Sequence, residues 1–174
     1  MTALTADTRP APGRSVLALI LFIAIAFAVA AVGSLATFQN VEGWYADADK
    51  AFWTPPNVVF GPVWTVLYTL MSVAAWLVWR EPASSARTRA LSVYIVQIAL
   101  NAIWTPVFFG LYPVVGPVAL WVALAIIVAL DVMVLVTMLR FWPVRRAAAV
   151  LLIPYWAWVL YATTLNAALA VLNP

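Results

Sequence analysis

Residues 114–139 read VVGPVALWVALAIIVALDVMVLVTML, an apolar run in which Asp131 is the only charged residue. This run is long enough to cross a bilayer, since a transmembrane helix needs about 20 apolar residues. Lipid offers the backbone no hydrogen bonds, so an apolar segment of this length without alternating polar residues must be a helix. Four more runs have the same character and carry no charge: Ser15–Thr37, Val58–Trp79, Ala90–Gly110 and Ala147–Leu172. The sequence therefore predicts an all-α membrane protein, a bundle of five transmembrane helices.

These runs leave little of the 174-residue chain for anything else, so we expect one domain, 15–172, after a disordered cytoplasmic tail at 1–14. The composition, 67% hydrophobic and 9% charged, agrees with a domain that lies wholly in the membrane. A cleaved signal peptide is the alternative for the first run, because Arg9 and Arg14 precede it. The run is longer than the roughly 7–15 apolar residues of a signal peptide, which favours a retained helix.

The basic residues lie on alternate sides of the predicted helices. Eight of the nine precede the first run or follow the second and fourth runs: Arg9, Arg14, Arg80, Arg87, Arg89, Arg140, Arg145 and Arg146. The opposite side has only Lys50, beside Glu42, Asp47 and Asp49. Because cytoplasmic segments carry the excess of Lys and Arg, we expect a multi-pass protein of the cell membrane with a cytoplasmic N-terminus and an external C-terminus. This bias also accounts for the net charge of +3 without a nucleic-acid partner.

The sequence contains no cysteine and no histidine. Disulfides, thiolate nucleophiles and sulfur-ligated metals are therefore excluded, and so are the commonest general base and the commonest metal ligand. We expect no metal site, no His- or Cys-dependent catalysis and no required cofactor. A bound haem could take an axial ligand only from Met or Tyr, which are rarer choices.

Polar and aromatic residues recur at helical spacing within three of the runs. The stripes are Trp64, Tyr68 and Met71 in the second run, Gln97, Asn101, Trp104 and Phe108 in the third, and Tyr155, Trp158, Ala162 and Asn166 in the fifth. Aromatic rings with hydrogen-bonding partners on three helices could wall a pocket for a flat, largely apolar ligand. The alternative is structural, since Asn and Gln often bridge membrane helices and aromatic residues fill cores.

Asp131 is the only charged residue within the predicted spans. An ionisable residue inside a membrane is a functional-site hypothesis by default. Since no basic residue lies within a span to pair with it, we expect a neutral acid that is hydrogen-bonded or faces a lumen. A proton carrier is the alternative, but the spans hold no second charged residue for a relay.

Three motifs resemble those of a known family, in the same order along the chain. Trp53–Pro56 (WTPP) and Gly61–Tyr68 (GPVWTVLY) are similar to the first loop and second helix of the tryptophan-rich sensory protein family, TspO/MBR. Its eukaryotic members are the translocator proteins, or peripheral benzodiazepine receptors. Asn101–Gly110 (NAIWTPVFFG) resembles the third-helix motif, and Pro154–Asn166 resembles the fifth-helix motif. The resemblance covers about residues 15–172.

The resemblance implies a five-helix bundle, usually a homodimer, that acts as a receptor or sensor for tetrapyrroles such as protoporphyrin IX and haem and for other flat hydrophobic ligands. Carried over by position, the ligand-binding residues would be Trp53, Pro55, Trp64, Tyr68, Asn101, Trp104, Tyr155, Trp158, Ala162 and Asn166, with the first two in a loop lid. Bacterial relatives are also associated with light-dependent porphyrin breakdown, for which Trp64 and Trp158 would be the pocket tryptophans. A transporter of porphyrins or other small hydrophobic molecules is the other alternative. No Lys or Arg follows Arg146, so the sterol motif of the eukaryotic fifth helix is missing.

Overall fold

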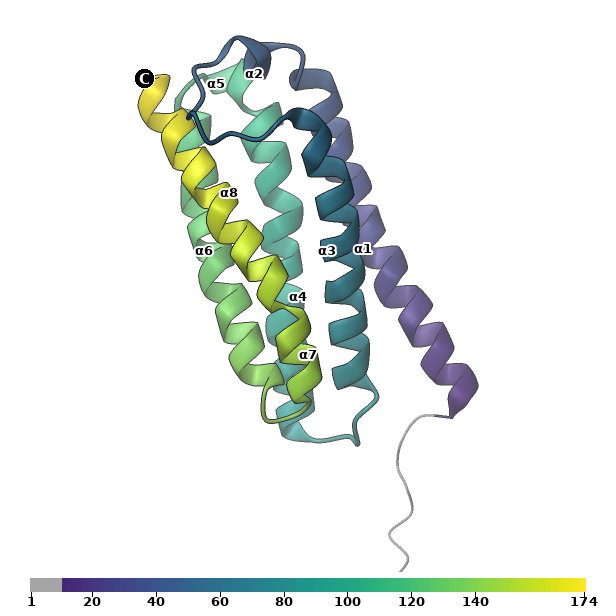
Figure 1. Ribbon diagram of the computed structural model, residues 1–174. Coiled ribbons are helices and arrows are strands. Elements are labelled where there is room, and N and C mark those ends of the chain that lie inside the picture. Colours follow the sequence, from purple (N-terminus) through teal and green to yellow (C-terminus); the bar gives the residue numbers. More distant parts are fainter. Residues whose placement is uncertain (1–10) are drawn as a thin grey trace, which may run out of the picture.

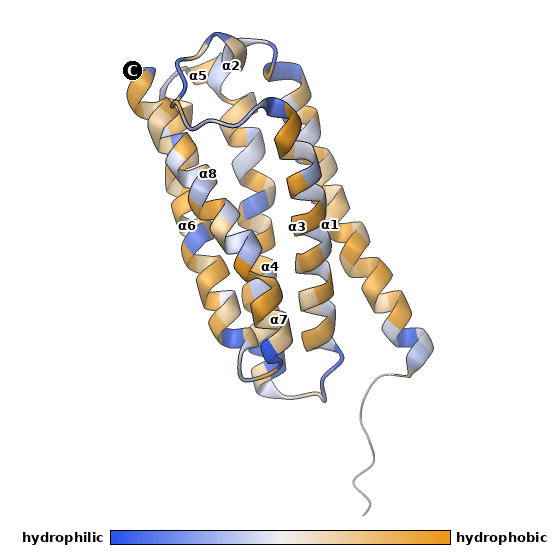
Figure 2. Cartoon of the chain, in the orientation of Figure 1, coloured by the Kyte–Doolittle hydropathy of each residue, from blue (hydrophilic) through white to orange (hydrophobic). Residues whose placement is uncertain are grey.

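The computed structural model describes residues 11–174, and this part of the chain is helical and contains no strand (Figure 1). Within it, five segments are long and apolar enough to cross a membrane: Pro12–Asn40, Asn57–Trp79, Ser85–Gly110, Val118–Phe141 and Arg146–Leu172. The predicted all-α bundle with five spans is therefore confirmed. Figure 2 shows that apolar residues dominate these helices and that polar residues gather mostly at the two ends of the bundle.

The helices follow the chain in a simple order. The first three spans are α1 (Pro12–Asn40), α3 (Asn57–Trp79) and α4 (Ser85–Thr105), and a π-helix, η1 (Pro106–Gly110), prolongs α4. The fourth span is α6 (Val118–Phe141), and the fifth consists of α7 (Arg146–Leu151) and α8 (Ile153–Leu172). Two short helices, α2 (Trp44–Asp47) and α5 (Tyr112–Val115), lie in connections at the end of the bundle that holds the C-terminus (Figure 1).

The observed helices depart from the predicted bounds where proline and glycine require it. α1 begins at Pro12 rather than Ser15, because proline needs no hydrogen-bond partner in a first turn. Residues 12–14 are therefore helical and do not belong to a tail, whereas residues 1–10 lie outside the described part. α6 begins at Val118 rather than Val114, because Gly116 has a φ of 65°, a left-handed value that glycine adopts without strain. Pro117 also disfavours helical backbone at the residue before it.

Two further prolines interrupt the third and fifth spans. Proline lacks an N–H group, and its ring clashes with the carbonyl four residues earlier in a regular helix. The helix widens to a π-helix from Pro106, and α7 gives way to α8 at Leu152, just before Pro154. α7 and α8 keep nearly one direction, so together they still form one span (Figure 1).

The bundle is built from pairs of neighbouring helices. α6 packs against both α4 and α8, whereas α1 packs against α3 and against α4 with its extension η1. α1 approaches the third span so closely that a Cβ on Gly33 would lie 3.3 Å from the Thr105 side chain. Much of α1 faces outward, and Leu35 and Phe38 are 67% and 85% exposed. Such an apolar outer surface is what a helix at the lipid-facing side of a bundle requires.

Candidate functional site

Asn101 of α4 connects α3 and α8 through two hydrogen bonds in the interior of the bundle. Its Oδ1 accepts a bond of 2.6 Å from the Tyr68 hydroxyl, and its Nδ2 donates one of 3.0 Å to the Tyr155 hydroxyl. All three side chains are buried. The predicted stripes on these three helices therefore face one another, and one amide side chain satisfies a polar group on each neighbour.

Asn166 of α8 makes a second polar connection. Its Oδ1 accepts a bond of 3.2 Å from the indole N–H of Trp104, and its Nδ2 donates one of 2.9 Å to the carbonyl oxygen of Leu120. This arrangement links α8 to both α4 and α6. Asn166 is 1% exposed, so its amide is available to a ligand only if these bonds open.

Aromatic rings fill the boundary between α3 and α8, where the two backbones approach each other at few places. The rings of Trp64 and Tyr155 have centroids 6.3 Å apart, and those of Phe60 and Trp158 are 5.8 Å apart. Both pairs are edge-to-face, an arrangement that attracts aromatic rings to one another. We call this boundary, lined by Phe60, Trp64, Tyr155 and Trp158, the α3–α8 seam.

The indole N–H of Trp158 is buried in the seam and has no hydrogen-bond partner within residues 11–174. A buried donor without an acceptor costs about 1–3 kcal/mol. Trp156 has an unpaired indole N–H as well, but its position in the helix places it on a different face of α8. The seam therefore combines broad aromatic surface with one unsatisfied donor.

A loop covers the seam at the end of the bundle that holds the C-terminus (Figure 1). We call residues 41–56, which include α2, the loop lid. The Tyr161 hydroxyl donates a bond of 2.6 Å to the backbone oxygen of Trp53, and the Trp53 indole donates one of 3.3 Å to the Thr164 hydroxyl. Trp53, which is 41% exposed, therefore lies over the outer part of α8 and not among the interior rings, and Pro55 is half-buried.

Further contacts hold the loop lid at Asp49 and Trp44. The Asn173 side chain accepts a hydrogen bond from the backbone N–H of Asp49 and donates one to the backbone oxygen of the same residue, at 2.9 and 3.0 Å. Trp44 donates to the carbonyl oxygen of Phe109 and stacks on Tyr112 with ring centroids 3.9 Å apart. Tyr45, which belongs to the lid, is buried, and burial raises the pKa of its phenol, so this residue stays neutral at ordinary pH.

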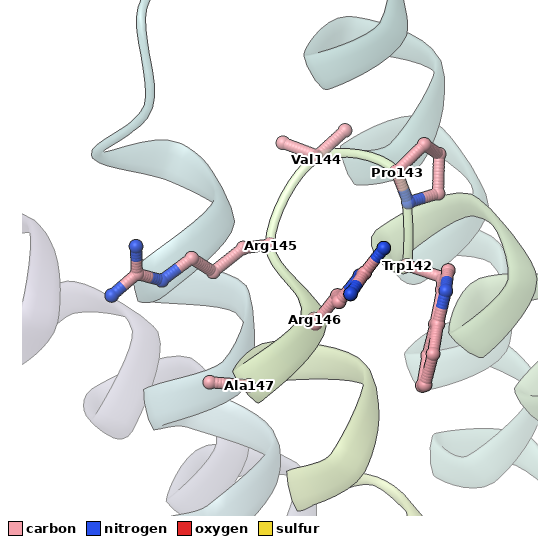
Figure 3. A pocket seen from close by; sticks show the side chains of 6 residues that line it. All are labelled: Trp142, Pro143, Val144, Arg145, Arg146 and Ala147. Carbon is pink, nitrogen blue, oxygen red and sulfur yellow. The ribbon is translucent and has the colours of Figure 1, made fainter.

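The predicted ligand residues form a packed cluster in this structure. Ala162 is buried on α8, and the remaining interior members hydrogen-bond or pack against one another as described above. Two hollows lie at the opposite end of the bundle, one lined by residues 142–147 (Figure 3) and one by Leu77, Arg80, Glu81 and Arg145. None of the predicted ligand residues lines either hollow, so a ligand would enter the seam by parting its rings.

The structure adds residues that the sequence patterns missed. Phe60 lies one helical turn before Trp64, so an extension of the α3 stripe by four residues would have included it. Tyr161 and Thr164 contact the loop lid across more than 100 residues of sequence, and helical periodicity gives no sign of such long-range contacts.

Asp131 of α6 lies against Thr163 of α8. The Thr163 hydroxyl oxygen is 2.7 Å from Asp131 Oδ2 and 3.0 Å from the carbonyl oxygen of Val159. A hydroxyl carries one proton and can donate to only one of these acceptors at a time. If Asp131 is a neutral acid, its own proton bonds to Thr163 and the Thr163 proton bonds to Val159. The other carboxyl oxygen is buried without a partner, which also disfavours a negative charge.

The fold and the seam together define a class of protein: a multi-pass helical membrane protein with an aromatic, tryptophan-lined interior. A family model described as "TspO/MBR family" matches residues 22–172. The chain therefore belongs to the TspO/MBR family, as its motifs indicated.

Individual relatives agree with this assignment. The chain is 37% identical over 159 residues to the tryptophan-rich protein TspO of Archaeoglobus fulgidus, a match that covers 91% of this chain and 99% of that protein. It is 36% identical to the tryptophan-rich sensory protein of Cereibacter sphaeroides, over 84% of this chain and 87% of that protein. It is 38% identical to the human translocator protein, over 74% of this chain and 75% of that protein.

Proposed function

We propose that this protein is a membrane receptor or sensor that binds flat, largely apolar ligands of the tetrapyrrole class in the α3–α8 seam. The observation that carries the proposal is the unpaired, buried indole N–H of Trp158 among the rings of Phe60, Trp64 and Tyr155. A tetrapyrrole offers a large ring face for stacking and carboxylate oxygens that accept hydrogen bonds. Both features complement what the seam contains.

The seam is a boundary of the bundle with few backbone contacts. α3 and α8 touch mainly through side chains, and Trp64 and Trp158 are only partly buried. α6, by contrast, packs extensively against α4 and α8. Because edge-to-face ring pairs are worth only about 0.5–1.5 kcal/mol beyond their burial, a stacked ligand can replace them.

The loop lid supplies the means of closing the site over a ligand. Its contacts with Tyr161 and Thr164 lie next to the seam on α8, and the rings of Trp158 and Tyr161 have centroids 5.5 Å apart. A ligand that displaces Trp158 therefore acts on the residue that holds the lid. This proximity would couple occupancy of the seam to the position of the loop.

Porphyrin titrations of the purified protein in detergent, carried out in the dark, test the proposal. Absorbance of the porphyrin should be recorded, because the variants change the number of tryptophans. Trp64→Ala and Trp158→Ala are expected to weaken binding by about 1–3 kcal/mol, the scale of lost burial and stacking. Trp121→Ala is the matched control, since Trp121 is 52% exposed on α6. Unchanged affinity in both seam variants, with the bundle still folded, would mean that porphyrin binds elsewhere.

A further inference from the structure

The end of the bundle away from the loop lid carries two adjoining hollows. The turn between α6 and α7 borders a hollow of about 570 Å³ lined by Trp142, Pro143, Val144, Arg145, Arg146 and Ala147 (Figure 3). A smaller hollow is lined by Leu77, Arg80, Glu81 and Arg145. Arg145 borders both, and we call the pair the arginine hollow.

The arginine hollow is strongly basic. Its lining holds three arginines, Arg80, Arg145 and Arg146, and one acidic residue, Glu81, which gives a net charge of +2. The Arg145–Glu81 ion pair is long, at 3.6 Å, and the Arg145 side chain is 51% exposed. Such an exposed pair is weak and leaves most of the arginine donors available.

The other two arginines are held by tryptophan rings. The guanidinium of Arg80 lies 4.5 Å from the ring centroid of Trp76, and that of Arg146 lies 5.8 Å from that of Trp142. Figure 3 shows the Arg146 side chain beside Trp142, whereas Arg145 extends away on the other side. Neither Arg80 nor Arg146 donates a side-chain hydrogen bond to residues 11–174. A guanidinium that rests on an aromatic ring keeps its N–H donors free for an anion.

Arg87, at the same end, shows what a structural arginine looks like in this protein. Its guanidinium donates to the carbonyl oxygens of Trp79 and Glu81 at 3.2 and 2.8 Å, and so caps the turn between α3 and α4. Arg145 and Arg146 have no such role in the fold. Orientation in the membrane requires only positive charge at this end, and does not explain why these two arginines border a hollow.

Lipid-facing surface continues from the hollow along two helices. On α6, Leu139 and Leu135 follow Trp142 toward the membrane interior and are 63% and 36% exposed. On the fifth span, Val150 and Ile153 follow Arg146 and are 48% and 47% exposed. Residues three or four apart share one face of a helix, so both apolar tracks begin at the hollow. Trp142, which is 50% exposed, has the amphipathic ring that suits the membrane interface.

We propose that the arginine hollow binds the phosphate group of an anionic phospholipid, with its two acyl chains along these two tracks. Arg146 donates to the phosphate oxygens, which accept bidentate hydrogen bonds from a guanidinium group, and Arg145 adds positive charge at the border of the hollow. Anionic lipids are the negatively charged molecules that a basic site at a membrane surface meets at high local concentration. This site is separate from the seam, and it does not depend on what the seam binds.

Native mass spectrometry of the full-length protein in detergent, titrated with phosphatidylglycerol or phosphatidylcholine of equal chain length, tests the proposal. The first bound phosphatidylglycerol should have about tenfold higher affinity than phosphatidylcholine, because a basic residue near a membrane surface contributes a several-fold preference for an anionic lipid. Arg146→Gln should weaken phosphatidylglycerol binding about fivefold, and the double variant Arg145→Gln/Arg146→Gln should weaken it further. The affinity for phosphatidylcholine should not change in either variant. Arg146→Lys should lose less than Arg146→Gln.

Arg89→Gln is the matched control, because Arg89 is exposed at the same end and lines neither hollow. An equal loss in Arg89→Gln and Arg146→Gln would show that total charge, and not the hollow, attracts the lipid. Equal affinity for the two lipids would also overturn the proposal. The phosphatidylglycerol titration is then repeated in the presence of inorganic phosphate. If phosphate at the same concentration as the lipid displaces the lipid, the site binds a free anion and the proposal is overturned. Thermal unfolding of each variant confirms that the fold is kept.

Discussion

Asn101 and Gln97 lie one turn apart on α4, yet their buried amides have different surroundings. Asn101 bonds to the hydroxyls of Tyr68 and Tyr155. Gln97 makes only a contact of 3.6 Å from its Nε2 to the sulfur of Met71, and its Oε1 has no partner within the described residues. A buried group that loses its partner costs more than a hydrogen bond contributes on average, so the two amides should respond differently to removal.

Asn101→Leu is therefore expected to lower the free energy of unfolding by about 1–2 kcal/mol, since both tyrosine hydroxyls lose a partner. Interhelical hydrogen bonds in membranes contribute about 0.6 kcal/mol on average and up to about 1.7 kcal/mol. Gln97→Leu should be neutral or stabilising, because it removes an amide that is poorly satisfied. Unfolding in mixed micelles of a mild detergent and a denaturing one measures both. Equal losses would show that the Asn101 bonds contribute nothing specific.

Asp131 gives a second prediction for a single residue. If it is a neutral acid that donates to Thr163, Asp131→Asn preserves the donor and should stay within about 0.5 kcal/mol of the parent, less than a net hydrogen bond. Asp131→Leu removes the donor and should cost about 1 kcal/mol. The same micelle unfolding measures this pair of variants. A larger loss for Asn than for Leu would show that a bond donated from this position to Thr163 does not stabilise the fold.

The sequence predicted which residues face the interior better than it predicted what they do there. The stripes that include Tyr68, Asn101 and Tyr155 follow helical periodicity, and lipid disfavours amide side chains on the outer face of a helix, so their convergence could be expected. The direct bonds among them depend on helix rotation and distance, which no spacing determines. Trp53, which we expect in the loop lid over a ligand, lies half exposed over Tyr161 and Thr164 in the structure.

At the scale of elements, residues 41–48 of the loop lid pack against the core, whereas residues 49–56 are held mainly by a few polar contacts. The Tyr161 hydroxyl and the Asn173 side chain bind its backbone at Trp53 and Asp49. These bonds lie near the surface, where they can be exchanged for bonds to water. Segments with few buried contacts open more easily than the helices that they connect.

Tyr161→Phe and Asn173→Ala are therefore expected to speed amide hydrogen exchange in residues 49–54, by up to about tenfold if each net bond is worth about 1 kcal/mol. Exchange in α4 and α6 should not change. Thr69→Val is the control, because the Thr69 hydroxyl bonds only within its own helix, to the Thr65 carbonyl oxygen. Unchanged exchange in both lid variants would show that other contacts hold the loop.

The bounds of the helices illustrate what sequence patterns can and cannot predict for an element. Hydropathy predicts the existence of each span, because the bilayer selects for about 20 apolar residues. It does not predict the short α5 and the delayed start of α6, since residues 114–117 carry no charged side chain to mark a boundary. The Gly116–Pro117 pair was the available signal, and its backbone requirements decide where α6 begins.

At the scale of the whole molecule, the arginines define one end of the bundle and the loop lid defines the other. Arg80, Arg140, Arg145 and Arg146 flank the ends of α3, α6 and α7, and the opposite end holds Lys50 among acidic residues. We propose on this basis that the arginine end faces the cytoplasm. A reporter enzyme fused after Pro174 should then be active only outside the cytoplasm, and activity inside would reverse the orientation.

The central claim is that a tetrapyrrole occupies the α3–α8 seam, and photoaffinity labelling tests it most directly. A protoporphyrin that carries a diazirine group would be bound in the dark, activated briefly and mapped by peptide mass spectrometry. The account predicts labels on residues 57–71 of α3 and residues 153–166 of α8, abolished by excess unlabelled porphyrin. Competed labels confined to the outer face of α1, or to the arginine hollow at residues 142–147, would contradict the account.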